Sequence, residues 1–243
     1  METTYKNIEV GADRFLALEW VNFAFELYHK QNDALVSYQI LREYLDGQIE
    51  GKESSRKTSN QIKRLWLTQD HFEYTRRKVL ELPYPINPEL VAILHLGIAV
   101  NVFPIYNETA KAISLLSGLG DVIPKQSVVN RVMETFANPS AIPRSISRVL
   151  QTLENWRLIK QDNQNISLAN VSLEEPGLAS WMLLAAVCAN GFKEVLLPDL
   201  LKLPQLVGIK IVDVRKVIKS GGILKIYRNI YGMEVVSSAD EQF

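Results

Sequence analysis

The chain has 243 residues and a mass of 27.6 kDa, with 47% apolar and 22% charged residues, close to the average globular protein. This composition excludes a disordered chain, a fibrous repeat and a mini-protein, and it supplies a core for one large domain or a few small ones. The 27 basic and 27 acidic side chains cancel, so attraction to a polyanion depends on uneven placement of charge. The single cysteine, Cys188, excludes an internal disulfide and a multi-cysteine metal site, and it is typical of a reducing cytosol.

Two apolar stretches, 90–106 and 180–189, are the only candidates for a membrane segment. Both are shorter than the roughly 20 residues that a span needs, and the first contains His95, Asn101 and Pro104. The N-terminus has no basic segment followed by an apolar one, so a signal peptide is not expected. We therefore expect a cytoplasmic protein without a membrane partner, in which both stretches are core helices.

The first part of the chain has the apolar spacing of helices, over about 13–30, 32–49, 57–68 and 70–81. A loop is expected over 51–55, where Gly51 and two serines interrupt the pattern. Three prolines between residues 83 and 88 form a rigid break. We therefore expect an N-terminal helical domain over 1–82.

The start of the helix predicted at 57–68 interleaves cations with hydroxyl and amide side chains. Free backbone amides at a helix N-terminus also favour phosphate, so this stretch is a candidate docking edge. The candidate DNA-binding residues here are Arg56, Lys57, Lys63 and Arg64. An ordinary solvated and capped helix start explains the same pattern.

Positive charge is concentrated in three stretches of the neutral chain. Residues 52–78 hold eight basic and three acidic side chains, 123–160 hold six and two, and 193–228 hold eight and three. A protein that docks on phosphates needs such segregation, provided that the stretches converge on one face. Three solvated faces without a common direction are the alternative.

A second domain is expected over 83–175. It opens with apolar helices over about 89–103 and 107–117, and its most informative part is 125–168. There the pattern predicts a helix over Gln126–Phe136, a turn from Ala137 to Ala141, and a second helix over Pro143–Asn155 that begins with a proline suited to a first turn.

The second helix of this pair has an apolar stripe and a polar remainder. Its stripe consists of Ile146, Val149, Leu150 and Leu153, at helical spacing. Its other faces carry Arg144, Ser145, Ser147, Arg148 and Gln151. Two short β-prone runs, 156–160 and 166–168, follow around the polar turn 161–165 and predict a hairpin.

Helix, short turn, helix and hairpin over about 45 residues resemble the winged helix-turn-helix family. The resemblance implies that the second helix enters the major groove of DNA and that the hairpin touches the adjoining backbone. Carried onto this chain, it assigns Arg144, Ser145 and Arg148 to the groove. Arg157, Lys160, Asn163 and Asn165 are then assigned to the neighbourhood of phosphates. Many winged helices bind only proteins, so a protein-interaction module is the alternative.

A C-terminal α/β unit is expected over 176–243, beginning at Pro176 and Gly177. A helical stripe over 211–218 precedes Gly221 and Gly222, and two β-prone runs follow at 223–227 and 231–236. This is again a helix followed by a hairpin, decorated with lysines and arginines. The pattern predicts a second winged helix or, alternatively, a plain α/β cap over the core.

The overall layout is also distantly similar to the BrxA proteins of bacterial BREX phage-exclusion systems. The similarity rests on the Ser/Thr-and-Arg helix start at 56–64, the apolar helix 90–103 and the helix before a hairpin at 145–159. It covers about residues 10–170, and this chain departs from it in the proline tract and in the extra C-terminal unit. The similarity implies DNA binding without catalysis in phage defence.

The sequence offers no signature of an enzyme, a metal site or a cofactor. It has three histidines without metal-binding spacing, and it lacks a Walker loop, a dinucleotide-binding glycine motif and a nucleophile elbow. His95 and Cys188 lie in apolar runs, where a hydrogen-bonded core histidine and a buried small residue are expected.

We therefore expect a mainly α, multi-helical protein with a winged helix-turn-helix and small β-hairpins, which binds double-stranded DNA with little sequence selectivity. A phage-defence or regulatory complex is its expected setting, with other defence proteins as partners. The alternatives are a protein-interaction scaffold and an RNA-binding protein.

Overall fold

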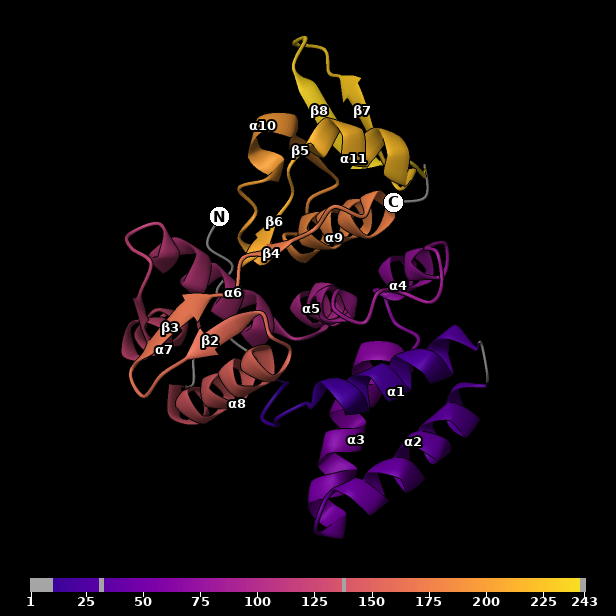
Figure 1. The fold of residues 1–243 in the computed structure, drawn as a ribbon, viewed down its shortest axis with the longest axis vertical. Helices are drawn as coiled ribbons and strands as arrows, with labels where there is room; N and C mark the ends of the chain where they lie inside the picture. Colours follow the sequence, from indigo (N-terminus) through magenta and orange to yellow (C-terminus); the bar gives the residue numbers. More distant parts are fainter. Residues whose placement is uncertain (1–10, 31–32, 137–138, 241–243) are drawn as a thin grey trace.

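The computed structural model describes residues 11–30, 33–136 and 139–240. This part of the chain is mainly helical with small sheets, which confirms the expected class (Figure 1). One hydrophobic cluster runs from the N-terminal helices through the centre to the C-terminal unit. Ala137 and Asn138 of the expected turn lie outside the described residues.

The N-terminal part consists of four helices: α1 (Leu18–His29), α2 (Ala34–Gln48), α3 (Lys52–Trp66) and α4 (Glu73–Val79). The helices α1, α2 and α3 pack on one another at one end of the molecule (Figure 1). Two sequence-based predictions were wrong here. The helix α3 begins at Lys52, directly after Gly51 turns the chain with φ of +88°, so the expected loop over 51–55 is helical. The helix α1 begins only at Leu18, because residues 11–17 are not helical and Leu16 bonds to Thr152 and Trp156 at the C-terminal end of α8 instead.

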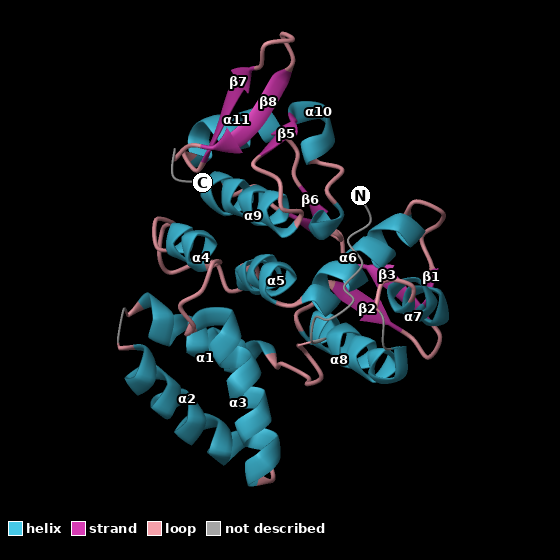
Figure 2. Cartoon of the chain, turned by 180° about the vertical axis from the view of Figure 1, so that it is seen from behind, coloured by secondary structure: helices cyan, strands magenta, loops and turns pink. Residues whose placement is uncertain are grey.

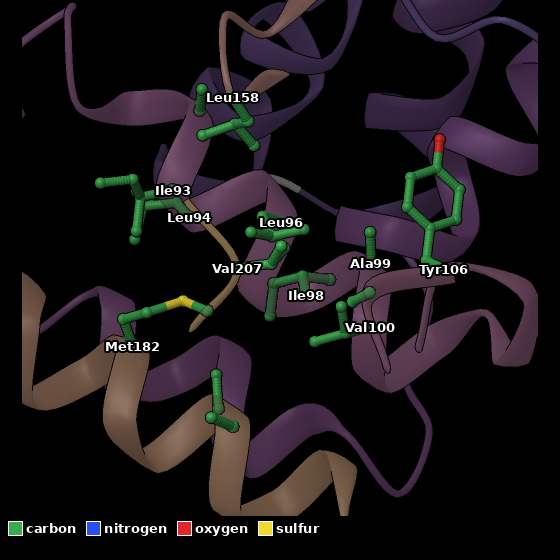
Figure 3. Packing of buried hydrophobic residues seen from close by; sticks show 14 of the residues in the cluster. Ile93, Leu94, Leu96, Ile98, Ala99, Val100, Tyr106, Leu158, Met182 and Val207 are labelled. Atoms are coloured by element: carbon green, nitrogen blue, oxygen red, sulfur yellow. The ribbon is translucent and has the colours of Figure 1, made fainter. Parts of the chain in front are cut away.

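The centre is built from α5 (Val91–Val102), α6 (Pro104–Ser117) and α9 (Pro176–Ala189). Every residue of α5 is buried, which explains why this helix is apolar on all sides. Figure 3 shows its Ile93 and Ile98 near Met182 of α9. Gly97 lets α5 approach α9 closely, since a Cβ atom there would lie 2.5 Å from the ring of Trp181.

No single helix in the described ranges is long and apolar enough to cross a membrane. Only α5 and α6 together reach the required length and hydropathy, and the chain bends by 111° between them. The bend falls at Pro104, which opens α6.

A small helix-and-sheet unit follows α6. It contains β1 (Ile123–Pro124), α7 (Lys125–Met133), the 3-10 turn η1 (Pro139–Ala141), α8 (Ile142–Asn155), β2 (Ile159–Gln161) and β3 (Asn165–Leu168). The strands form an antiparallel sheet of order β1-β3-β2, with Ile123 opposite Ile166 and Ile159 opposite Leu168. The two predicted helices and the hairpin are therefore present, with η1 over the described end of the expected turn, together with a strand β1 that the sequence did not indicate.

The C-terminal part surrounds the end of α9. It contains β4 (Val171–Ser172), β5 (Glu194–Leu196), α10 (Leu197–Leu200), η2 (Pro204–Leu206), β6 (Ile209–Lys210), α11 (Val214–Gly221), β7 (Leu224–Arg228) and β8 (Glu234–Ser238). The strands β4 and β6 pair in parallel, and β5, β8 and β7 form an antiparallel sheet in that order. This part lies at the end of the molecule opposite to α2 and α3 (Figures 1 and 2).

Candidate nucleic-acid interface

The helix α8 is fixed along one side and free along the other. Its buried stripe consists of Ile142, Ile146, Val149, Leu150 and Leu153, in contact with α6 and α7. Pro143 occupies the first turn, as its missing N–H group allows. Arg144, Ser147 and Gln151 are exposed on the opposite side. The outward side of α8 therefore presents donors in a fixed direction.

Two of the three side chains that the sequence assigned to the groove lie on this outward side. Arg144 is exposed, and half-buried Arg148 donates from Nη1 to Oε1 of Gln151 at 2.8 Å. Ser145 is only 2% exposed, so its assignment to a binding surface was wrong. It follows Ile142 by three positions and precedes Val149 by four, and this spacing places it in the buried stripe. Ser147 takes its place on the outward side.

The segment 11–17 covers the C-terminal half of α8. The backbone N–H of Leu16 donates to Oγ1 of Thr152 at 3.0 Å, and the indole of Trp156 donates to the carbonyl of Leu16 at 2.9 Å. Phe15 then lies beside the outward side of α8, where it lines a shallow hollow of about 440 Å³ with Arg148 and Gln151. Of the residues that the structure describes, segment 11–17 leaves the N-terminal half of the outward side of α8 uncovered.

The hairpin after α8 has a turn shaped by Asp162. Its carboxylate accepts the backbone N–H groups of Gln164 at 2.8 Å and Asn165 at 2.6 Å, and these bonds lower the pKa of Asp162. The side chain of Asn165 also bonds to this carboxylate, at 3.3 Å, so it stabilises the turn. Asn163 remains exposed at the tip.

Positive charge flanks this hairpin. Lys160 on β2 is exposed, and so is Arg157, which leaves α8 with φ of +59°. The ammonium group of Lys125 donates to the carbonyl of Asp162, which ties the start of α7 to the hairpin turn. The sequence alone did not predict a role for Lys125, because its position beside the turn depends on the pairing of β1 with β3.

The predicted basic edge on α3 forms a real hollow, but Lys63 is not part of it. Arg56, Lys57 and Arg64 line a hollow of about 640 Å³ between α3 and residues 11–13. Lys63 points elsewhere, with its ammonium group 4.7 Å from the ring centroid of Tyr38.

The cations of this hollow already have partners. Glu53 accepts from Arg56 at 2.8 Å and lies 3.3 Å from the ammonium group of Lys57. These two contacts lower the pKa of Glu53 to about 2. The guanidinium of Arg64 lies 4.8 Å from the ring of Phe103. Phosphate binding here would therefore compete with Glu53 for two of the three cations.

The first two basic stretches contribute to adjoining surfaces, whereas the third lies far from both. Residues 11–13 line the hollow on α3, and Phe15 of the same segment lines the hollow on α8, so the two surfaces adjoin. The basic residues of α11 and β7 lie toward the opposite end of the molecule (Figures 1 and 2). The expected convergence of all three stretches on one face was therefore wrong for the C-terminal one.

Burial shifts the pKa of two side chains from the apolar helices, His95 and Cys188. His95 is fully buried with hydrogen bonds on both ring nitrogens, as expected for a core histidine, and burial lowers its pKa to about 3. Burial raises the pKa of Cys188 to about 11, which makes its thiol a poor nucleophile at neutral pH. Among the described residues, no group of three or more His, Cys, Asp or Glu side chains is arranged to hold a metal ion.

Comparison of the chain with protein-family models, with curated proteins and with solved structures finds no match.

Proposed function

We propose that this protein binds double-stranded DNA through a winged helix-turn-helix formed by α6 to β3, with little sequence selectivity and without catalysis. The observation that carries the proposal is α8, which is anchored along one side, presents Arg144 and Arg148 on the other, and leads into a hairpin flanked by cations. The order of elements and the strand order β1-β3-β2 support this class, since a winged helix follows its second helix with such a hairpin.

In the proposed complex the N-terminal half of α8 enters the major groove. The planar guanidinium of Arg144 can form two parallel hydrogen bonds with a phosphate or with a guanine edge, and Arg148 follows one turn later. Lys160 and Arg157 then face the backbone beside the groove. Asp162 repels phosphate at the hairpin turn, so we assign the backbone contact to these two cations rather than to Asn163 or Asn165.

The hollow on α3 extends this surface. Because residues 11–15 line both hollows, a duplex on α8 has Arg56, Lys57 and Arg64 within the adjoining surface. Phosphate can replace Glu53 as the partner of Arg56 and Lys57, since an exposed ion pair is held only weakly. Lys63 is left out of the proposed surface because of its position over Tyr38.

We infer the biological setting from the distant resemblance of the layout to the BrxA proteins. On this inference the protein acts in the bacterial cytoplasm, in a phage-defence or regulatory complex with other proteins. Binding that tolerates any sequence suits such a role, because phosphate contacts have the same geometry on every duplex.

Duplex affinity measured over a range of salt concentrations tests the proposal. We expect the logarithm of the association constant to fall linearly with the logarithm of salt, with a slope of about −0.9 for each phosphate neutralised. Absence of binding at low salt, or an association constant that does not change with salt, would contradict binding through phosphate contacts. Competition with structured RNA separates the RNA-binding alternative, which predicts that RNA displaces the duplex.

One observation favours a scaffold role as the second candidate. The helix α2 exposes apolar side chains along one side, with Leu35 at 69%, Val36 at 48% and Ile40 at 37% exposure. Exposed apolar side chains gathered on one helix are typical of a protein-docking face. Recovery of a partner from nuclease-treated lysate, lost in a Leu35→Ser/Ile40→Ser variant, would support this role.

A further inference from the structure

The C-terminal unit repeats the chain path of the proposed DNA-binding unit. In the first unit the order is α6, β1, α7, α8, β2, β3, and the sheet order is β1-β3-β2. In the second the order is α9, β5, α10, α11, β7, β8, and the sheet order is β5-β8-β7. Both sheets are antiparallel throughout. By this correspondence α11 takes the place of α8, and the β7–β8 hairpin takes the place of β2–β3.

The repeat has one insertion. Residues 201–213 separate α10 from α11 and contain β6, which pairs in parallel with β4 just after the first hairpin. The insertion links the two units through backbone hydrogen bonds, such as that from Val171 to the carbonyl of Gly208 at 2.7 Å.

The helix α11 is held on one side by α9, as α8 is held by α6. Val217 and Ile218 are buried, and α11 packs on α9. Gly221 permits this approach, because a Cβ atom there would collide with Ser180 of α9. Asp213 caps the start of the helix by accepting the backbone N–H of Lys216 at 3.0 Å. The direction in which the free side of α11 points is therefore fixed.

The free side of α11 is cationic. Lys216 and Lys219 are exposed at a spacing of three residues, and within the described chain no carboxylate lies within 4.0 Å of either ammonium group. Arg215 instead bonds Glu234 on β8 through two nitrogens, one of them at 2.9 Å, and this contact lowers the pKa of Glu234. The ion pair joins the helix to the hairpin.

The hairpin itself is suited to contact with a groove. Lys225 and Arg228 are exposed on β7, and the turn beyond them exposes Ile230 at 91% and Tyr231 at 76%. Minor-groove proteins use this combination, in which cations hold phosphates and apolar side chains press against base steps.

We propose that the C-terminal unit is a second duplex-binding site, with Lys216 and Lys219 of α11 facing the major groove and the β7–β8 hairpin contacting the adjoining backbone. The proposal rests on the proposed function, since duplex DNA is the ligand of both units. Because α11 lies near one end of the molecule and α8 lies away from it, at the side of the middle part, one chain can hold two short duplexes at once (Figures 1 and 2).

The number of duplexes bound per chain tests this proposal. The probe is a labelled duplex of about one helical turn, roughly 10 base pairs, which is too short to serve both units. Sedimentation at low salt measures how many duplexes one chain binds at saturation. We expect two for the unmodified chain and one for Lys216→Ala/Lys219→Ala. The exposed position of both lysines predicts an unchanged thermal unfolding midpoint for this variant.

A matched control is Lys30→Ala/Lys202→Ala, which removes two exposed cations outside α8, α11 and the hairpins. We expect it to bind two duplexes. Arg144→Ala/Arg148→Ala should keep only the C-terminal site. Equal stoichiometry and affinity for Lys216→Ala/Lys219→Ala and the control would overturn the second site and leave the proposed function intact. If Lys216→Ala/Lys219→Ala loses one bound duplex while Arg144→Ala/Arg148→Ala still binds two, the role of α8 would instead be overturned.

Salt dependence provides a second readout on the same variants. Removing two phosphate contacts should lower the salt slope of the C-terminal site by about 2, measured in the Arg144→Ala/Arg148→Ala background. A surface for a protein partner predicts another result: Lys216→Ala/Lys219→Ala would reduce recovery of that protein from nuclease-treated lysate while duplex binding stays the same. That outcome would also overturn the proposal.

Discussion

The indole of Trp66 donates a hydrogen bond to Nδ1 of His95, with 3.1 Å between the two nitrogens. On the other side of the ring, Nε2 of His95 lies 2.6 Å from Oδ1 of Asn22. Since Nδ1 accepts, the neutral ring carries its proton on Nε2 and donates it to Asn22. A protonated ring would have no acceptor for a hydrogen on Nδ1 and would carry a buried charge, so the fold holds this histidine neutral.

We expect this histidine to make the protein sensitive to mild acid. Its pKa is about 3 in the folded chain and about 6.5 when unfolded, so below pH 6.5 the unfolded state binds a proton that the folded state does not. The free energy of unfolding should fall by about 1.4 kcal/mol per pH unit, or roughly 2 kcal/mol by about pH 5. Urea denaturation of the natural chain and of His95→Gln over this range measures it. The variant should be less stable at neutral pH but lack this component, and a constant stability difference would contradict the account.

Neighbouring arginines on α4 should differ sharply in their effect on stability. The guanidinium of Arg76 is fully buried. It donates to the carboxylate of Asp70 and to three backbone carbonyls at and just after the end of α3, those of Arg64, Leu65 and Thr68. Arg76→Met should cost about 3–5 kcal/mol, because these acceptors lose their partner. Arg77→Ala, which removes an exposed side chain paired with Glu73, should cost less than about 1 kcal/mol. Chemical denaturation compares the two, and equal losses would refute the structural role of Arg76.

Two helical glycines offer a test of the packing between α5 and α9. Gly97→Ala places a methyl group 2.5 Å from Trp181 and should destabilise the protein by about 1–3 kcal/mol through overpacking. Gly47→Ala in α2 meets no described atom within 4 Å and should stabilise it by about 0.5–1 kcal/mol, because alanine favours the helix. The thermal unfolding midpoints of both variants measure these changes in stability. A neutral Gly97→Ala would mean that the two helices are not in such close contact.

The assignment of α8 to DNA makes a residue-level prediction. Arg144→Ala/Arg148→Ala should weaken duplex binding by the N-terminal unit about tenfold or more, since each arginine supplies a phosphate or base contact. Ser145→Ala should leave the affinity unchanged, because that hydroxyl is buried. Fluorescence anisotropy with a labelled duplex measures these effects, and Lys30→Ala/Lys202→Ala controls for lost charge. An arginine variant that binds like this control would remove α8 from the interface.

Periodicity in the sequence predicted much of what is local. The apolar spacing of residues 143 to 155 predicted α8, and the polar turn around Asp162 predicted the hairpin. The apolar surroundings of His95 correctly predicted a buried, hydrogen-bonded side chain. These features depend on neighbours within a few positions, and such neighbours are visible in a single sequence.

Local sequence patterns gave wrong predictions for two side chains, Ser145 and Arg76. Ser145 was counted with the polar side of α8, although its spacing from Ile142 and Val149 places it in the buried stripe. Arg76 was counted in a basic stretch, but its guanidinium is buried on carbonyl oxygens and adds no charge to the surface. Charge counts along a chain treat every cation as exposed, and burial is decided by the residues packed around it.

By itself, then, the sequence determined most of the helices, the turn chemistry and the order of helix, turn, helix and hairpin after residue 125. Only the tertiary structure decided that residues 11–17 run along α8, that Lys63 turns away from the hollow on α3, and that the C-terminal strands repeat the order of the first sheet. Each of these depends on hydrogen bonds or packing between residues far apart in the chain. Their free energy comes from contacts that form only when the whole core assembles, so no local pattern encodes them.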